Sequence, residues 1–185
     1  MTEVEATSAQ PAEAIPSPGS RPEGRPEWPV FIGLAAVVLA ADQLTKLWLT
    51  SFLAPGESVD VVGDLVRLIH GRNAGGLFGL FQGQAIVFGL VSMVVVGLIV
   101  AYHARSGRSL YLSITLGLLL GGALGNLVDR LRINYVVDFV DVGIGDVRWY
   151  TFNVADAAIS FAILLLLAAS VRPSLARRAG EEGPG

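Results

Sequence analysis

Long apolar runs alternate with shorter polar segments along this chain. The runs cover about residues 30–50, 85–103, 110–128 and 152–171. A helix needs roughly 20 apolar residues to cross the hydrocarbon core of a bilayer. The pattern therefore predicts a mainly α membrane protein with four transmembrane helices.

The connections between these runs differ in character. Residues 55–83 mix short Val/Ile-rich runs with glycine turns, which predicts a few strands and an amphipathic piece on the membrane surface. Residues 135–152 predict a hairpin around Gly143 to Asp146. The fold class therefore includes a small β-rich and amphipathic cradle outside the membrane, which we expect to shape a site at the outer interface.

The two ends of the chain differ from the membrane domain, residues 29–172. Residues 1–28 are rich in Pro, Ala, Glu, Ser and Gly, so we expect a disordered tail, and residues 173–185 form a second tail. An alternative interprets the first apolar run as the core of a cleaved signal peptide ending before Asp42. The helical spacing of apolar residues resumes after Asp42, which favours one continuous transmembrane helix.

Arginine positions indicate the orientation. Four spans place both tails on one side, and that side carries seven arginines against five on the other. Positively charged residues favour the cytoplasm, so we expect both tails to be cytoplasmic. The seven are Arg21, Arg25, Arg105, Arg108, Arg172, Arg177 and Arg178, and the five are Arg67, Arg72, Arg130, Arg132 and Arg148.

Composition narrows the chemistry. The chain is 52% hydrophobic, with mean hydropathy +0.59, and has no cysteine, which excludes thiolate and disulfide chemistry. A net charge of -3 with scattered basic residues argues against a nucleic-acid partner. His70 and His103 lie far apart without a ligand partner at helical spacing, so we expect no metal and no cofactor. Serine catalysis stays open, although no histidine base is placed for it.

A group of polar residues falls at one depth of the predicted membrane domain. Its members lie at the outer end of the third span, in the following loop and at the start of the fourth span. They are Asn126, Asp129, Arg130, Asp138, Asn153 and Asp156. An ionisable residue costs about 2.5 to 3.5 kcal/mol at the centre of a membrane helix, so each needs a reason to be there.

Structural explanations compete with functional ones for these residues. Asp129 and Arg130 fit an ion pair at a helix end, and Asn153 with Asp156 fits a helix N-cap. Asn73, within the segment GRNAGGLFG, fits a turn.

Two features fit a purely structural interpretation best. Asp42 and Lys46 are four residues apart in the acid-before-base order of a helical pair, which would hold the first span to its neighbours. Gly117, Gly121 and Gly125 form a small-residue stripe, which predicts close helix packing.

The remaining acid and base groups are aspartates. Two aspartates held a few ångströms apart do not both ionise, so one keeps its proton and the other is a base. Such a pair activates water to hydrolyse an amide without a covalent intermediate.

Five segments occur in the order and spacing of one family: DQLTK (42–46), GRNAGGLFG (71–79), GGALGNLVDR (121–130), VVDF (136–139) and FNVADAAI (152–159). Together they resemble the bacterial lipoprotein signal peptidases, or signal peptidase II, over about residues 30–171. The resemblance implies an aspartic endopeptidase of the bacterial inner membrane, with its active site at the outer face. We expect it to be a monomer. Its expected partners are membrane lipid and prolipoproteins, which it cuts on the amino side of a diacylglyceryl cysteine.

The resemblance also implies roles for individual residues. By motif position, Asp138 and Asp156 are the catalytic pair, and Asp42 is a structural acid. The residues expected to line the pocket and hold the substrate backbone are Asn73, Asn126, Asp129, Arg130 and Asn153. Segment 55–83 is expected to act as a cradle and lid.

Two other functional classes compete with the peptidase interpretation. Buried aspartates also form proton relays in transporters, but the chain has no evident inverted repeat. A structural membrane subunit would use the polar cluster only to hold helices together, which leaves the cost of so many polar groups at one depth without a function.

Overall fold

Residues 27–75, 83–106 and 109–176 are described by a computed structural model. Within these ranges, four helices are long and apolar enough to cross a membrane. They are α1 (Trp28–Thr50), α2 (Ala85–Ser106), α3 (Leu110–Ile133) and α4 (Val154–Val171), and a short 3-10 helix, η2, covers Pro173–Ala176. The predicted four-helix fold is confirmed. The expected lid around residues 76–82 and nearly all of both predicted tails lie outside the described residues.

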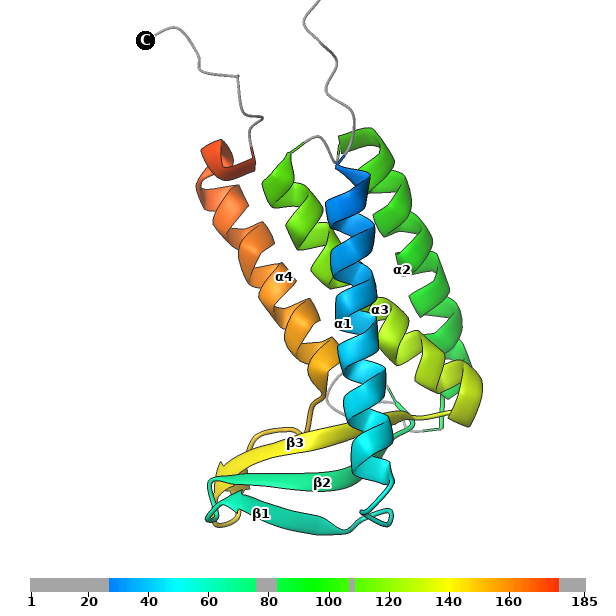
Figure 1. The fold of residues 1–185 in the computed structure, drawn as a ribbon, viewed down its shortest axis with the longest axis vertical. Coiled ribbons are helices and arrows are strands. Elements are labelled where there is room, and N and C mark those ends of the chain that lie inside the picture. Colours follow the sequence, from blue (N-terminus) through cyan, green and yellow to red (C-terminus); the bar gives the residue numbers. More distant parts are fainter. Residues whose placement is uncertain (1–26, 76–82, 107–108, 177–185) are drawn as a thin grey trace, which may run out of the picture.

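The helices form a bundle with a small sheet across one end (Figure 1). The start of α1 and the end of α4 both lie at the opposite end of the bundle. The prediction that both termini of the membrane domain share one side is therefore confirmed as geometry.

Glycines let α3 lie close to its neighbours. α3 contacts α1, α2 and α4, which makes it the central helix. A Cβ atom on Gly121 would lie 2.7 Å from the Ala35 carbonyl oxygen of α1, and one on Gly122 would lie 2.5 Å from the Ala155 carbonyl oxygen of α4. The backbones therefore approach to distances that only glycine allows, which confirms the helix-packing interpretation of the small-residue stripe.

The third helix is longer than its apolar run. Hydropathy predicts a span ending near residue 128, whereas α3 continues to Ile133 and ends at Asn134, which has a φ of 60°. Asparagine tolerates this left-handed conformation, which commonly ends helices. The additional turn is polar because it enters the cluster described below, so hydropathy places the end of the apolar run rather than the end of the helix.

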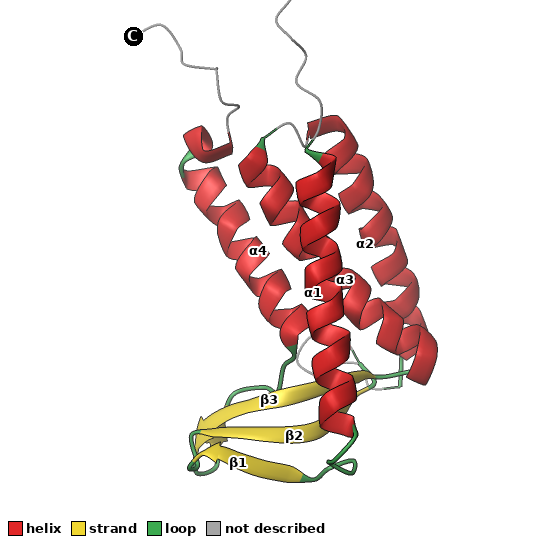
Figure 2. Cartoon of the chain, viewed as in Figure 1, coloured by secondary structure: helices red, strands yellow, loops and turns green. Residues whose placement is uncertain are grey.

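The sheet contains residues from both predicted extramembrane segments (Figure 2). Its strands are β1 (Ser58–Val62), β2 (Val66–Asn73), β3 (Val136–Ile144) and β4 (Val147–Arg148), paired antiparallel in that order. The β3–β4 pairing of Ile144 with Val147 confirms the predicted hairpin. In the β2–β3 pairing, Gly71 lies opposite Asp138, and a Cβ on Gly71 would lie 2.8 Å from the Asp138 carbonyl oxygen.

Two apolar clusters hold these parts together. The larger joins α1, α2 and α3 through buried residues such as Phe31, Ile99 and Leu120. The smaller joins the end of α1 to β3 through Leu49, Leu53 and Phe139, which fixes the sheet against the bundle. Large apolar side chains on the outer faces of α1, α2 and α4 are exposed, as expected for helices that face lipid.

Candidate active site

Asp138 is buried on β3, with 4% of its surface exposed. Each of its carboxylate oxygens accepts a hydrogen bond from an asparagine. Asn73 Nδ2 on β2 donates to Oδ2 at 3.1 Å, and Asn153 Nδ2 donates to Oδ1 at 2.8 Å. The side chain of Asn73 also accepts from the Gly75 backbone at 3.0 Å, so this residue both forms a turn and contacts Asp138.

Asp156 lies in the first turn of α4 and forms a capping box with Asn153. The Asn153 side chain accepts from the Asp156 backbone N–H at 2.9 Å, and Asp156 Oδ2 accepts from the Asn153 N–H at 3.3 Å. The predicted cap is therefore confirmed. Asp156 Oδ1 accepts from Asn126 Nδ2 of α3 at 2.8 Å, which directs the carboxyl group toward the bundle interior.

Asn153 connects the two carboxyl groups. It is fully buried, its side chain donates to Asp138, and its backbone donates to Asp156. Its amide also donates to Asn126 Oδ1 at 3.2 Å. β3 and α4 are thus joined at one residue, which brings together aspartates that are eighteen positions apart in the sequence.

The environment of Asp138 favours its protonated form. Burial first, and then the nearby charge of Asp156, raise the pKa of Asp138 from 3.8 to about 7. The hydrogen bonds from Asn73 and Asn153 and the charge of Lys46 oppose this shift. Asp138 therefore holds its proton to a higher pH than an exposed aspartate does.

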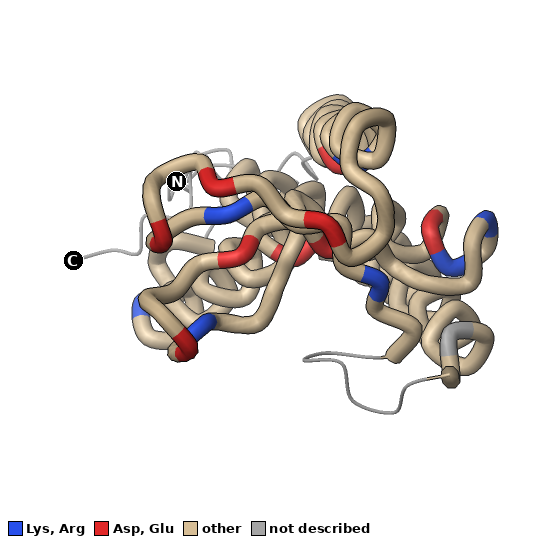
Figure 3. The backbone as a smooth tube through the Cα atoms, turned by 90° about the horizontal axis from the view of Figure 1, so that it is seen from below, with Lys and Arg blue, Asp and Glu red and all other residues tan. Residues whose placement is uncertain are grey.

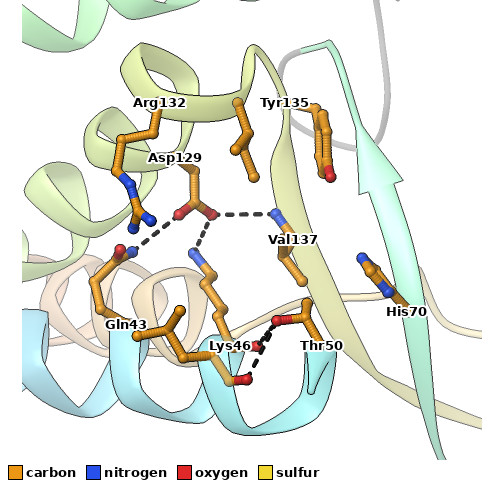
Figure 4. A pocket seen from close by; sticks show the side chains of 10 residues that line it. Gln43, Lys46, Thr50, His70, Asp129, Arg132, Tyr135 and Val137 are labelled. Carbon is orange, nitrogen blue, oxygen red and sulfur yellow. Dashed lines mark hydrogen bonds and ion pairs between the residues drawn. The ribbon is translucent and has the colours of Figure 1, made fainter. Parts of the chain in front are cut away.

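Asp129 binds a different cation from the one the sequence suggested. Its carboxylate lies 2.8 Å from Lys46 Nζ on α1 (Figure 4). The same ammonium lies 2.8 Å from Asp42. The neighbouring Arg130 instead donates to the backbone carbonyls of Gly75 and Asn126, at 3.1 and 3.2 Å. The predicted Asp129–Arg130 helix-end pair is thus replaced by a buried cluster around Lys46, because one turn of helix directs adjacent residues to different sides.

The cluster around Lys46 links three elements to the site. Asp42 is fully buried and accepts from the Ala155 N–H of α4 at 3.0 Å, while Asp129 accepts from the Val137 N–H of β3 at 3.1 Å. Val137 immediately precedes Asp138. Asp42 and Lys46 of α1 thus contact α4 and α3 directly, and their structural role stays a prediction.

Gln43 is a member of this cluster that the sequence interpretation missed. Its amide donates to Asp129 Oδ1 at 2.9 Å and to the Gly125 carbonyl oxygen at 3.2 Å. The available signal was its place beside Asp42 in the segment DQLTK. Burying an uncharged amide costs less than burying a carboxylate, so a glutamine in an apolar run is a weaker sign of a specific role than an aspartate.

The histidines and the surface charges have partners other than the carboxyl pair. His70 Nδ1 lies 2.8 Å from the Leu53 carbonyl oxygen, whereas His103 stacks on Phe31 with ring centroids 4.0 Å apart. Seen from the sheet end, acidic and basic positions lie together along the strands (Figure 3), as in the Arg148–Asp141 pair at 2.7 Å. In the described ranges, no group of three or more His, Cys, Asp or Glu residues is arranged to hold a metal ion.

Comparison with known proteins decides the family. The family model described as Signal peptidase (SPase) II matches residues 34–172, a range that contains the carboxyl pair and the cluster around Lys46. The chain belongs to this family. Signal peptidase II enzymes are membrane proteases, and membership implies removal of signal peptides from lipoproteins.

Individual relatives are similar in sequence to this chain over most of its length. A lipoprotein signal peptidase of Moorella thermoacetica is 41% identical over 154 residues, covering 83% of this chain and 97% of that protein. One from Syntrophus aciditrophicus is 40% identical over 144 residues, covering 75% and 89%.

Two solved bacterial membrane enzymes have similar folds. The first has a TM-score of 0.76 at 24% identity, covering 86% of this chain and 98% of its own, and at that identity it supports the fold alone. The second has a TM-score of 0.73 at 25% identity, covering 82% and 99%.

Proposed function

We propose that this signal peptidase II is an aspartic endopeptidase in which Asp138 and Asp156 are the catalytic pair. Its substrates are diacylglyceryl-modified prolipoproteins, cut on the amino side of the lipidated cysteine. The observation that carries the proposal is that Asn153 binds the carboxyl groups of both Asp138, which is buried, and Asp156, which is half-buried, at the junction of the sheet and the bundle. A lipid-anchored peptide reaches such a junction without leaving the membrane.

Two neighbouring carboxyl groups that act together on water and an amide need different protonation states. We assign Asp138 as the protonated acid and Asp156 as the ionised base, because two adjacent carboxyl groups avoid ionising together. Asp156 takes a proton from water while the water oxygen bonds to the scissile carbonyl carbon. Asp138 gives its proton to the carbonyl oxygen as that oxygen becomes the hydroxyl of a tetrahedral intermediate.

Collapse of the intermediate completes the reaction. The proton on Asp156 passes to the amide nitrogen, and the bond between carbon and nitrogen breaks. The hydroxyl returns its proton to Asp138 as the carboxylic acid of the released signal peptide forms. Both aspartates regain their starting protonation, and no covalent enzyme intermediate is needed.

The surrounding residues have distinct supporting roles in this proposal. Asn73, Asn126 and Asn153 orient the two carboxyl groups and line the space where the substrate backbone binds. Asp129 is a positioning residue, because it holds the backbone N–H next to Asp138. Arg130 contributes a positive charge and binds the Gly75 carbonyl oxygen, which keeps the end of β2 beside the site.

We also propose the cellular arrangement. The protein works as a monomer in the bacterial inner membrane, with both tails cytoplasmic and the sheet at the outer face. Residues 29–172 form the peptidase domain. Because the chain has no cysteine, single cysteines introduced at Ser58 and Ser170 report their own accessibility to an impermeant maleimide. If the maleimide labels Ser170→Cys but not Ser58→Cys in intact cells, the proposed orientation is wrong and the sheet lies on the cytoplasmic side.

The catalytic assignment is tested with matched aspartate variants. Purified wild type, Asp138→Asn and Asp156→Asn are assayed for cleavage of a diacylglyceryl-modified prolipoprotein, with folding checked by thermal unfolding in detergent. Asp141→Asn is the control, because Asp141 is buried on the same strand but pairs with Arg148. We expect folded, inactive protein from the first two substitutions and cleavage from the control.

Two outcomes would contradict the proposal. Substantial cleavage by folded Asp138→Asn, together with an inactive, folded Asp129→Asn, would show that Asp129 rather than Asp138 is the partner of Asp156. Failure of folded wild type to cut the lipidated substrate would remove the peptidase proposal itself.

A further inference from the structure

A cavity lies on the other face of β3 from the carboxyl pair. Its volume is about 180 Å³, and residues of α1, α3, β2 and β3 line it (Figure 4). Val137 contributes to its wall, whereas the next residue, Asp138, points to the opposite face of the strand, as alternation along a strand requires. Neither proposed catalytic aspartate lines this cavity.

His70 presents an unsatisfied polar atom at the cavity. Only 6% of this residue is exposed, and its Nδ1 lies 2.8 Å from the Leu53 carbonyl oxygen, so Nδ1 carries the hydrogen and donates it. The other ring nitrogen, Nε2, has no hydrogen-bond partner among the described residues. A buried polar atom without a partner costs about 1 to 3 kcal/mol, which a polar ligand in the cavity would offset.

The cavity also carries a cation that is available to a ligand. Lys46 lines it, but its ammonium is bound between Asp42 and Asp129. Arg132, on the last turn of α3, lines the same cavity and is exposed, and it forms no ion pair with any residue that the structure describes. A guanidinium binds phosphate oxygens in a bidentate manner, so Arg132 favours a phosphate group.

The cavity is placed where lipid headgroups lie. It is at the sheet end of the bundle, and its wall includes Leu47 and Ile133, which are 52% and 37% exposed on the outer surface of the helices. At about 30 Å³ for each water in the liquid, its volume corresponds to roughly six water molecules. That is room for a small headgroup but not for a folded peptide segment.

We propose that this cavity binds the headgroup of an anionic glycerophospholipid. Its phosphate contacts Arg132, a headgroup hydroxyl donates to His70 Nε2, and its acyl chains lie outside along Leu47 and Ile133. Basic pockets beside membrane helices bind lipid headgroups in this manner. The site is independent of the proposed catalytic chemistry, although its wall contains Asp129, which holds the backbone beside Asp138.

The experiment measures lipid binding rather than cleavage. Full-length protein is delipidated in detergent and titrated with phosphatidylglycerol, and bound lipid is counted by native mass spectrometry. Phosphatidylcholine, which has no headgroup hydroxyl and no net charge, is the comparison lipid. Soluble glycerol phosphate is the competitor that distinguishes a lipid site from a site for a free phosphate.

Two substitutions remove the proposed contacts one at a time. Arg132→Gln is expected to weaken phosphatidylglycerol binding about tenfold, since it removes a charged hydrogen bond. His70→Asn keeps a donor in the place of Nδ1 but removes Nε2, so a loss of about threefold to tenfold is expected. Arg105→Gln is the matched control, because Arg105 lies at the opposite end of the bundle, in the last turn of α2.

The expected result is tighter binding of phosphatidylglycerol than of phosphatidylcholine, weakened by Arg132→Gln and unchanged by Arg105→Gln. Equal binding of both lipids, or unchanged binding in folded Arg132→Gln, would overturn the proposal. Displacement of the lipid by soluble glycerol phosphate at equal concentration would identify a site for a free phosphate instead. If His70→Asn does not fold, Arg132→Gln decides by itself.

Discussion

Asn153→Ser separates the two functions of the residue that joins the carboxyl groups. Serine and asparagine are about equally good N-caps, so the serine oxygen still accepts the Asp156 N–H that Asn153 now binds at 2.9 Å. Serine has no amide, however, and the 2.8 Å hydrogen bond to Asp138 is lost. The substitution therefore changes the environment of Asp138 while it keeps the start of α4.

The structure gives the sign and size of the effect. The Asn153 hydrogen bond lowers the pKa of Asp138, which burial holds at about 7, so its removal raises that pKa further. A hydrogen bond to a charged group contributes about 1.5 to 3 kcal/mol, and one pKa unit corresponds to about 1.4 kcal/mol. We expect the pKa of Asp138 to rise by at least about one unit.

The assay is the pH dependence of kcat/KM for cleavage of the lipidated prolipoprotein, from about pH 5 to about pH 9. If Asp138 acts as the acid, activity falls as pH rises through its pKa, so Asn153→Ser moves this alkaline limb to higher pH. Asn153→Ala is the control: it moves the limb similarly but also loses the cap, at a further cost of about 1 kcal/mol in stability. An alkaline limb that stays in place or moves down in folded Asn153→Ser would refute the assignment of Asp138 as the acid.

Three further predictions concern stability, each measured by thermal unfolding in detergent. The pKa of Asp138 is about 7 in the folded state against 3.8 in the unfolded state, so the folded state holds this proton more tightly. The free energy of unfolding therefore falls as pH rises through this range, by up to about 4 kcal/mol. Asp138→Asn should therefore have a higher Tm than wild type above neutral pH and about the same Tm near pH 4. A difference in Tm that does not vary with pH would show that the Asp138 proton is not its cause. Lys46→Met should destabilise by about 3 to 5 kcal/mol, because it leaves two buried carboxylates without their cation, and an unchanged Tm would argue against the buried cluster. Gly121→Ala should lower the free energy of unfolding by about 1 to 3 kcal/mol, because its Cβ would lie 2.7 Å from the Ala35 carbonyl oxygen. Gly33→Ala is the control and should not destabilise, because nothing lies within 4 Å of its Cβ. Equal Tm values for the two variants would contradict the close packing at Gly121.

The site shows where sequence reasoning reached its limit. The motifs singled out Asp138 and Asp156, and charge in an apolar run singled out Asp42, Lys46 and Asp129. Adjacency nevertheless suggested Arg130 as the partner of Asp129, whereas Lys46, eighty-three positions away, binds it at 2.8 Å. Partners across a bundle depend on which helix faces meet, and a local sequence pattern does not contain that information.

The same distinction applies to the fold and to the cavity lined by His70 and Arg132. The positions of the four membrane helices and the β-rich segments follow from the sequence alone, because the length of an apolar run and the residues of a turn act locally. Only the tertiary structure decided that α3 runs on into the polar cluster, that Asn153 holds both carboxyl groups, and that His70 and Arg132 line one cavity. These features depend on side chains brought together from distant elements, where burial and shared hydrogen bonds set both their geometry and their chemistry.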